Sequence, residues 1–144
     1  MDDCRWIWHF ERVLPNDTRA GRQVVDQVLA RLRRHAWADT DIFAVHLATE
    51  EALVNAIRHG NSSDPTKHIG FCCRLADDRV RIEITNQGPG FDPDRVPDPT
   101  QPDRLLLGGG RGMALMRGFM SSVKYRDHGR QVILERLRQC EARR

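Results

Sequence analysis

Hydrophobic periodicity over the first 60 residues predicts one strand followed by two helices. Apolar side chains alternate over residues 6–13, with Trp6, Trp8 and Phe10 on one face. Over residues 19–35 the apolar residues recur at helical spacing, as Val24, Val25, Val28, Leu29 and Leu32. A second helical stripe starts near Asp39 and stops near Gly60, and it consists of Ile42, Val45, Thr49, Leu53 and Ile57.

The second half of the chain predicts two strand hairpins with a short helix between them. Residues 69–75 and 80–85 form the first hairpin, and residues 122–126 and 131–137 form the second. Between the hairpins, Leu115, Met116 and Phe119 lie at helical spacing, which predicts a helix over 113–120.

Residues 91–110 differ from the rest of the chain. They show no hydrophobic periodicity, contain several prolines and end in a run of three glycines. A segment of this length inside a compact domain is typical of a functional loop, so we expect it to form a lid.

Helices clustered beside strand hairpins indicate an α+β fold. We expect a two-layer α/β sandwich in which a mostly antiparallel sheet carries the helices on one face. The 144 residues show no repeat and no break in composition, so we expect one domain over 1–144.

Composition argues against several functions. With 23 basic and 20 acidic side chains, the net charge of +3 is too small to indicate direct binding to nucleic acid. No apolar run is long enough to span a membrane, and the acidic start does not resemble a secretory signal, so we expect a cytoplasmic protein.

The cysteine and histidine positions do not indicate a metal site. Cys72 and Cys73 would point to opposite faces of a strand and cannot bind one zinc ion together, so small buried thiols are expected. His46 and Glu50 have the spacing of metal ligands but lack a third.

Candidate chemistry begins on the second predicted helix. Glu51, Asn55 and His59 are spaced four residues apart, so they share one polar face. The Asn55 side-chain oxygen is a suitable ligand for Mg²⁺, and Glu51 lies one turn away, where its carboxylate can orient a hydroxyl. Taken alone, this stripe is more typical of a solvated helix face.

Two glycine-rich runs follow. Asn86-Gln87-Gly88-Pro89-Gly90 comes directly after a predicted strand, where glycine allows the backbone to approach a flat ligand closely. Gly108-Gly109-Gly110-Arg111-Gly112 comes directly before a predicted helix, where exposed N–H groups and the Arg111 charge favour phosphate. Neither run is a Walker A loop or a complete dinucleotide-binding fingerprint.

In this order the three elements resemble the GHKL (Bergerat-fold) ATPases. The run from Glu51 through Asn55 to Gly60-Asn61 resembles the N box of that superfamily. Asn86-Gln87-Gly88-Pro89-Gly90 resembles the G1 box, and Gly110-Arg111-Gly112-Met113 resembles the G2 box. The short length and the Gly-Arg-Gly-Met-Ala-Leu-Met run are most similar to the anti-sigma-factor serine/threonine kinases of the RsbW and SpoIIAB type.

The resemblance implies a role for each motif residue. Glu51 would be the general base, and Asn55 would bind the Mg²⁺ that accompanies ATP. The remaining residues would contact the nucleotide, with adenine over the first three and phosphate near the others: Asn86, Gly88, Gly90, Gly110, Arg111, Gly112 and Met113. One position departs from the family, whose G1 box normally opens with Asp. The Asn86 oxygen can still accept a hydrogen bond from the adenine amino group, but it lacks the charge.

Three functions remain open at this stage. The first is an ATP-dependent protein serine/threonine kinase and anti-sigma regulator, whose partners by resemblance are a sigma factor and a STAS-domain anti-anti-sigma protein, and which forms a homodimer. The second is a non-catalytic, nucleotide-gated switch that sequesters a sigma factor or another regulator. The third is the catalytic half of a histidine kinase, which we disfavour because no helical hairpin carrying a phosphoacceptor His precedes the predicted domain. The pairing of Glu51 with Asn55 favours the kinase.

Overall fold

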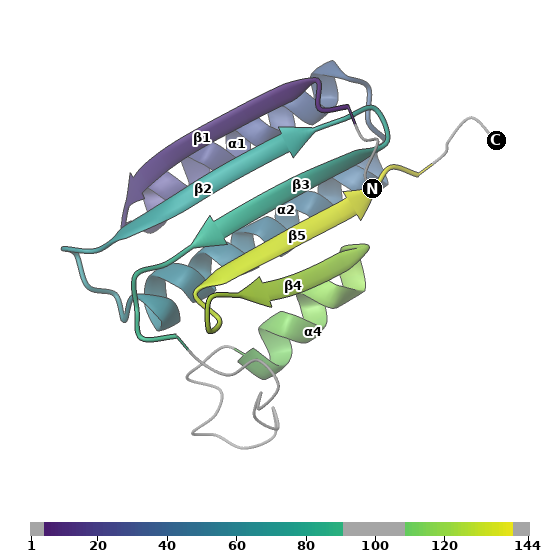
Figure 1. The fold of residues 1–144 in the computed structure, drawn as a ribbon. Helices are drawn as coiled ribbons and strands as arrows, with labels where there is room; N and C mark the ends of the chain where they lie inside the picture. The colour runs from purple at the N-terminus through teal and green to yellow at the C-terminus, as the bar shows by residue number, and fades with distance from the viewer. Residues whose placement is uncertain (1–4, 91–108, 140–144) are drawn as a thin grey trace.

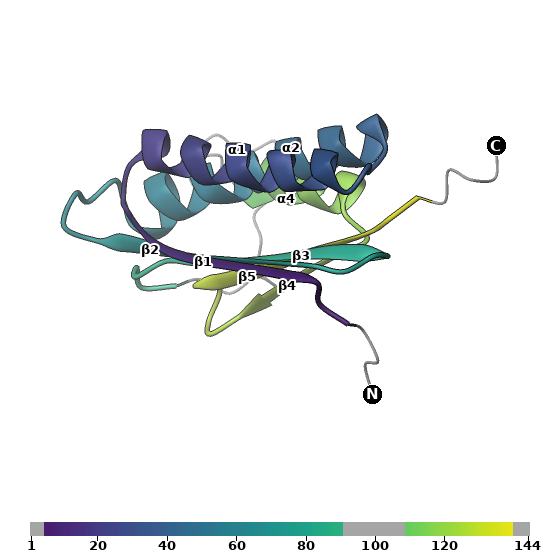
Figure 2. The ribbon, with the colours of Figure 1, turned by 90° about the horizontal axis from the view of Figure 1, so that it is seen from above.

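One antiparallel sheet carries the helices on a single face (Figures 1 and 2). The computed structural model describes residues 5–90 and 109–139. In these ranges the sheet has five strands in the order β1-β2-β3-β5-β4, and every neighbouring pair is antiparallel. Figure 2 shows the three labelled helices side by side above the sheet, which confirms the predicted two-layer α+β sandwich.

The elements follow one another in the predicted order. Their bounds are β1 Trp8–Pro15, α1 Thr18–Arg34, α2 Asp39–Val54, η1 Asn55–Gly60, β2 His68–Leu75, β3 Arg79–Thr85, α4 Gly109–Phe119, β4 Ser122–Arg126 and β5 Gln131–Leu137. No helix among the described residues is both long enough and apolar enough to cross a membrane.

The core fills the space between the helices and the inner face of the sheet. Alternate residues of β2 and β3 point into it, among them Phe71, Cys73 and Ile82, while their neighbours face away from the helices. All five residues of the predicted stripe on α2 and η1 are buried: Ile42, Val45, Thr49, Leu53 and Ile57. The two adjacent cysteines do point to opposite faces, but only Cys73 is buried, so the prediction of buried thiols is wrong for the half-exposed Cys72.

Two predicted elements are displaced along the sequence. β1 covers 8–15 rather than 6–13, because all eight of its residues pair with the eight residues of β2. α4 starts at Gly109, not at residue 113, so the glycine-rich run forms the first helical turn rather than a loop before it. The first-turn N–H groups of a helix have no intrahelical partner, so this turn can still present donors to an anion.

The second helix changes form before it ends, whereas the sequence predicted one uniform α-helix. α2 stops at Val54, and η1 continues as a π-helix, in which the Asn61 N–H donates to the Ala56 carbonyl at 2.8 Å. Single π-turns often lie at functional sites. Here the wider turn begins at Asn55, one of the predicted site residues, and it delivers Asn61 to the centre of a polar network.

Asn61 joins three segments of the chain and is completely buried. Its amide nitrogen donates to Asn16 Oδ1 and to the His68 carbonyl, both at 3.0 Å. Its oxygen accepts from the Gln87 N–H at 2.7 Å. One side chain therefore links the end of β1, the start of β2 and the loop after β3, with its donors and its acceptor all used.

We expect Asn61→Ala to lower the free energy of unfolding by about 2–4 kcal/mol, because it removes the three hydrogen bonds by which a completely buried side chain links three segments of the chain. Urea denaturation followed by circular dichroism measures the change. Gln27→Ala, on the exposed face of α1, is the matched control and should change stability by less than about 0.5 kcal/mol. Equal stability of the two variants would show that the network does not stabilise the fold.

Candidate functional site

Three elements meet around Glu51 and Asn55. Glu51 lies in the last turn of α2, Asn55 opens η1, and Gly112 lies in the first part of α4. A Cβ added to Gly112 would overlap Glu51 Oε2 and would lie 2.9 Å from Asn55 Nδ2. The structure therefore brings the predicted N box and G2 box into direct contact, and any side chain at position 112 would force the ends of Glu51 and Asn55 to move.

The environment of Glu51 suits a base. Its pKa is raised above the usual value, chiefly because burial disfavours the charged carboxylate. A hydrogen bond from the Asn55 side chain opposes this shift, and the negative charge of Glu50 adds to it. Because the Asn55 amide group donates to Glu51, its own oxygen remains available for another partner.

Tyr125 of β4 belongs to the same neighbourhood, although sequence reasoning did not single it out. Burial raises the pKa of its hydroxyl to about 12, the positive charge of Arg117 lowers it, and the charge of Glu51 raises it further. These couplings place β4 and the middle of α4 within electrostatic reach of the Glu51 carboxylate. The residue lies seventy-four positions beyond Glu51, so only the folded topology brings the two together.

The G1 box packs against the end of η1. A Cβ at Gly88 would overlap the Gly60 carbonyl oxygen, and a Cβ at Gly60 would overlap the Asn86 amide. The Asn86 oxygen accepts from the Gly88 N–H at 2.9 Å, which closes a tight turn within the loop. The Asn86 side chain is thus already bonded on one side, and one lone pair of its oxygen is left for a ligand.

Arg130 holds this loop from the other side and was missed by sequence reasoning. Its Nε donates to the Gly88 carbonyl at 2.8 Å, and its Nη2 donates to the Pro89 carbonyl at 3.1 Å. Its own carbonyl accepts from the Asn86 N–H at 2.9 Å. Gly90 has a φ of 85°, and a Cβ there would overlap the His128 carbonyl oxygen. The turn between β4 and β5 therefore forms one wall of the G1 loop.

The remaining residues singled out in the sequence lie in different surroundings. Gly110 and Arg111 lie in the first turn of α4, near the contact of Gly112 with α2. Met113 is only 3% exposed and packs in the hydrophobic core, so any contact with a ligand would have to come from its backbone. Burial, and to a smaller degree Arg58, lowers the pKa of His59, which favours a neutral ring at physiological pH. Most of the predicted lid, 91–108, lies outside the described residues.

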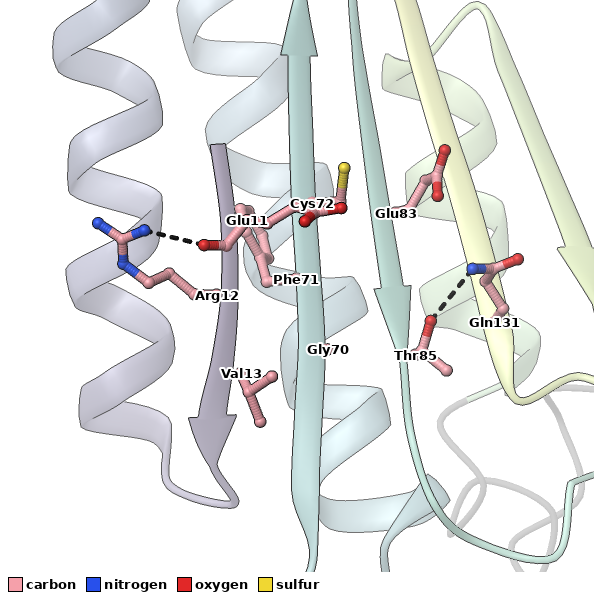
Figure 3. A pocket seen from close by; sticks show the side chains of 9 residues that line it. All are labelled: Glu11, Arg12, Val13, Gly70, Phe71, Cys72, Glu83, Thr85 and Gln131. Carbon is pink, nitrogen blue, oxygen red and sulfur yellow. Dashed lines mark hydrogen bonds between the residues drawn. The ribbon is translucent and has the colours of Figure 1, made fainter. Parts of the chain in front are cut away.

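A hollow of about 500 Å³ lies elsewhere (Figure 3). Its lining comes from the outer face of the sheet, and includes Val13, Gly70, Thr85 and Gln131. The residues that meet at Gly112 lie on the helix-bearing side instead. We place the candidate site at the latter, because the predicted N box and G2 box meet there and the G1 box packs against the end of η1.

Comparisons with known proteins agree with the predicted fold and with the predicted superfamily. The profile of the histidine kinase-like ATPase domain matches residues 14–136. The serine-protein kinase RsbW of Staphylococcus epidermidis is 30% identical over 97 residues, which cover 62% of this chain and 61% of that protein. The anti-sigma F factor of Oceanobacillus iheyensis is 29% identical over 86 residues, which cover 58% of this chain and 59% of that protein. The chain thus spans about three fifths of the length of these curated relatives.

A solved structure shares the architecture. The crystal structure of the RsbU and RsbW domains of Rv1364c from Mycobacterium tuberculosis superposes with a TM-score of 0.61 at 19% identity, covering 92% of this chain and 33% of that one. At this identity the likeness supports the fold alone.

We expect Glu51→Gln to stabilise the protein, and to do so increasingly as pH rises. The folded-state pKa of Glu51 lies above its usual value of 4.5, so the unfolded chain loses this proton more readily. Well below pH 4.5 both states are protonated and the variant has no advantage of this origin. Above the raised pKa the folded wild type carries a partly buried charge that the variant lacks. Denaturation of both proteins across this pH range measures the difference, and an advantage that shrinks towards neutral pH would contradict the assigned environment.

Proposed function

This chain belongs to the histidine kinase-like ATPase domain family, and on that premise we propose that it is an ATP-dependent protein serine/threonine kinase that acts as an anti-sigma-type regulator. One observation carries the proposal. The start of α4 lies directly against a partly buried carboxylate and an amide, those of Glu51 and Asn55. Phosphoryl transfer needs a phosphate-binding element, a metal ligand and a base within one small space, and these elements supply a candidate for each.

The residues present fit ATP with Mg²⁺. The Asn55 amide lies directly against Gly112, and its oxygen is not used by its hydrogen bond to Glu51. Amide oxygens are suitable ligands for Mg²⁺, so Asn55 would hold the ion. When bound, Mg²⁺ neutralises charge on the phosphates. The first-turn N–H groups of α4, at Gly110, Arg111 and Gly112, would bind phosphate oxygens at the positive end of the helix dipole.

The loop formed by the G1 box would bind the adenine ring. Gly88 and Gly90 would form the floor under adenine, because glycine permits a flat ring to lie close to the backbone. Asn86 would accept the adenine amino group with the lone pair that its bond to Gly88 leaves over. Arg130 would act here as a positioning residue, because it holds the two carbonyl groups that shape the loop.

Glu51 would act as the general base. Its carboxylate would take the proton of a serine or threonine hydroxyl while that oxygen attacks the γ-phosphorus and ADP departs. A base is most effective when its pKa lies near the working pH, and burial moves the pKa of Glu51 in that direction.

The partner is proposed from the relatives. Two of them are named as a serine-protein kinase and an anti-sigma factor, which favours a sigma factor as the sequestered protein. By the family resemblance, a STAS-domain anti-anti-sigma protein would supply the hydroxyl, the chain would form a homodimer, and both partners would place it in the cytoplasm.

We expect Gly112→Ala to weaken Mg-ATP binding by at least about tenfold, because the added methyl displaces Glu51 and Asn55 from their places, and the loss of one hydrogen bond to a charged group is worth about 1.5–3 kcal/mol. Gly118→Ala on the same helix is the matched control, since a Cβ there meets nothing within 4 Å. The control should keep its affinity and gain up to about 1 kcal/mol of stability. Calorimetric titration of both variants decides, and unchanged binding by the Gly112 variant would remove this contact from the nucleotide site.

Transfer of labelled γ-phosphate tests the proposed reaction itself. Proteins captured from cell extract with and without ATP, together with a STAS-domain protein, are offered to wild type and to Glu51→Gln. We expect the variant to bind ATP and partner normally while transferring phosphate at least about 100-fold more slowly, since it lacks only the base. Equal rates would exclude Glu51 as the base. If wild type binds ATP and its partner but transfers nothing, the chain is instead a nucleotide-gated switch.

A further inference from the structure

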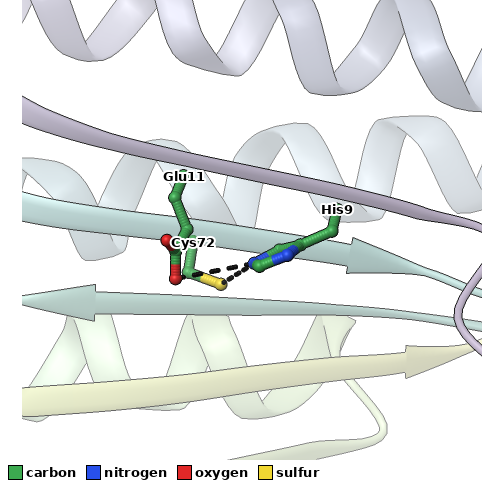
Figure 4. Close-up of side chains that lie close together, drawn as sticks. All are labelled: His9, Glu11 and Cys72. Carbon is green, nitrogen blue, oxygen red and sulfur yellow. Dashed lines mark hydrogen bonds and ion pairs between the residues drawn. The ribbon is translucent and has the colours of Figure 1, made fainter.

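The outer face of the sheet gathers a histidine, a carboxylate and a thiol at one point, shown in Figure 4. The sheet register produces this cluster. Glu11 of β1 is the direct cross-strand partner of Cys72 of β2, and His9 lies two residues before Glu11 on the same face. Side chains on such direct and diagonal pairs lie within reach of one another. The three sit on the side that the helices leave uncovered.

Two of the three distances between their ligand atoms match those of a tetrahedral ion. Two ligands bound to zinc at about 2.0–2.3 Å in tetrahedral geometry lie about 3.3–3.6 Å apart. In the structure, His9 Nε2 lies 3.5 Å from Cys72 Sγ and 3.5 Å from Glu11 Oε2. All three ligand atoms lie within 4.8 Å of one another. A single ion would need only small side-chain adjustments to contact them all.

The charge balance is also suitable. A thiolate from Cys72 and the Glu11 carboxylate together neutralise a divalent cation, and the neutral imidazole of His9 completes the set. The nearest competing charges are already paired, because Glu83 forms ion pairs with Arg74 and with Arg81, each with an N···O distance of 3.0 Å. Mixed nitrogen, oxygen and sulphur ligands favour a borderline metal such as Zn²⁺ over Mg²⁺ or Ca²⁺.

We propose that His9, Glu11 and Cys72 form a three-ligand site for Zn²⁺ on the outer face of the sheet. Glu11 and Cys72 also line the hollow of about 500 Å³, so the remaining coordination position opens towards that space and can take water or a donor from another molecule. The site is separate from the proposed nucleotide site, which lies on the helix-bearing side. Zinc would tie β1 to β2 from outside.

Metal titration of the full chain, without an affinity tag and in a non-thiol reductant, tests the site in the absence of nucleotide. Co²⁺ serves as the spectroscopic probe, because a thiolate ligand produces a charge-transfer band. Zn²⁺ affinity is measured by competition with a chromophoric chelator. We expect one ion per chain, and a rise in the melting temperature on adding Zn²⁺, because the ion binds only the folded arrangement.

Single substitutions assign the ligands. Cys72→Ser should abolish the Co²⁺ band, and His9→Ala and Glu11→Gln should each weaken Zn²⁺ binding by more than about tenfold. His46→Ala is the matched control, because His46 and Glu50 form another His–carboxylate pair, 3.7 Å apart, without a thiol. Cys4→Ser combined with Cys140→Ser controls for two of the other three thiols, and the third, Cys73, is buried in the core.

The result that overturns the proposal is equally specific. A band that survives Cys72→Ser, a loss of affinity in His46→Ala as large as in His9→Ala, or the absence of one-to-one binding by wild type would each do so. Circular dichroism and melting of every variant without metal exclude misfolding as the cause. Neither ATP binding nor phosphate transfer enters the readout, so this site can fail while the proposed kinase stands.

Discussion

The close approach of two backbone segments, at Gly60 and Gly88, is the constraint on which the site depends. The Gly60 carbonyl oxygen occupies the place where a side chain at Gly88 would begin, so no other residue at 88 leaves this packing unchanged. Asn61, the next residue after Gly60, then holds the loop through the Gln87 N–H. The end of the second helix and the loop after β3 are therefore one rigid unit. Because Asn55 begins the same π-turn, the candidate metal ligand and the candidate adenine loop are positioned by a common piece of backbone.

A second glycine contact, at Gly112, forms the opposite side of the site and explains why the pKa of the Glu51 carboxylate is raised. Gly112 lets α4 come so near to α2 that Glu51 loses part of its water, and this loss is the largest cause of its raised pKa. The buried pair at the far end of the same helices holds α4 in this position. There Asp41, which is fully buried, accepts Arg136 Nε at 2.7 Å, and Arg136 also donates to the Phe119 carbonyl at the end of α4. Contacts at both ends of α4 thus fix its place beside α2: Glu51 and Asn55 meet its first part, and Arg136 binds its end.

The sequence predicted the fold well because its signals were local. Alternation in β2 and β3 and the stripe on α2 follow directly from burial on one face, and the structure bears out both. The π-turn was not predictable in this way, since its hydrogen bonds differ from those of an α-helix while its residues do not. Arg130 and Tyr125 were missed for another reason. Their roles depend on which strands become neighbours, and neither lies near a motif in the sequence. The outer cluster was missed likewise, because Cys72 finds its partners on β1, about sixty residues away.

Asn86 shows how a departure from a family pattern can be compatible with the local physics. The related ATPases normally open this loop with Asp, and an Asp oxygen would also accept the Gly88 N–H that closes the turn. The turn itself therefore does not distinguish the two residues. Burial does distinguish them, since position 86 is only 9% exposed and a carboxylate there would lose most of its hydration. The guanidinium of Arg130 is directed at the Gly88 and Pro89 carbonyls rather than at residue 86. The neutral amide of Asn86 thus keeps the geometry of the loop without burying a charge. Replacing Asp by Asn therefore weakens the hydrogen bond that this position can accept from a ligand, and leaves the shape of the site unchanged.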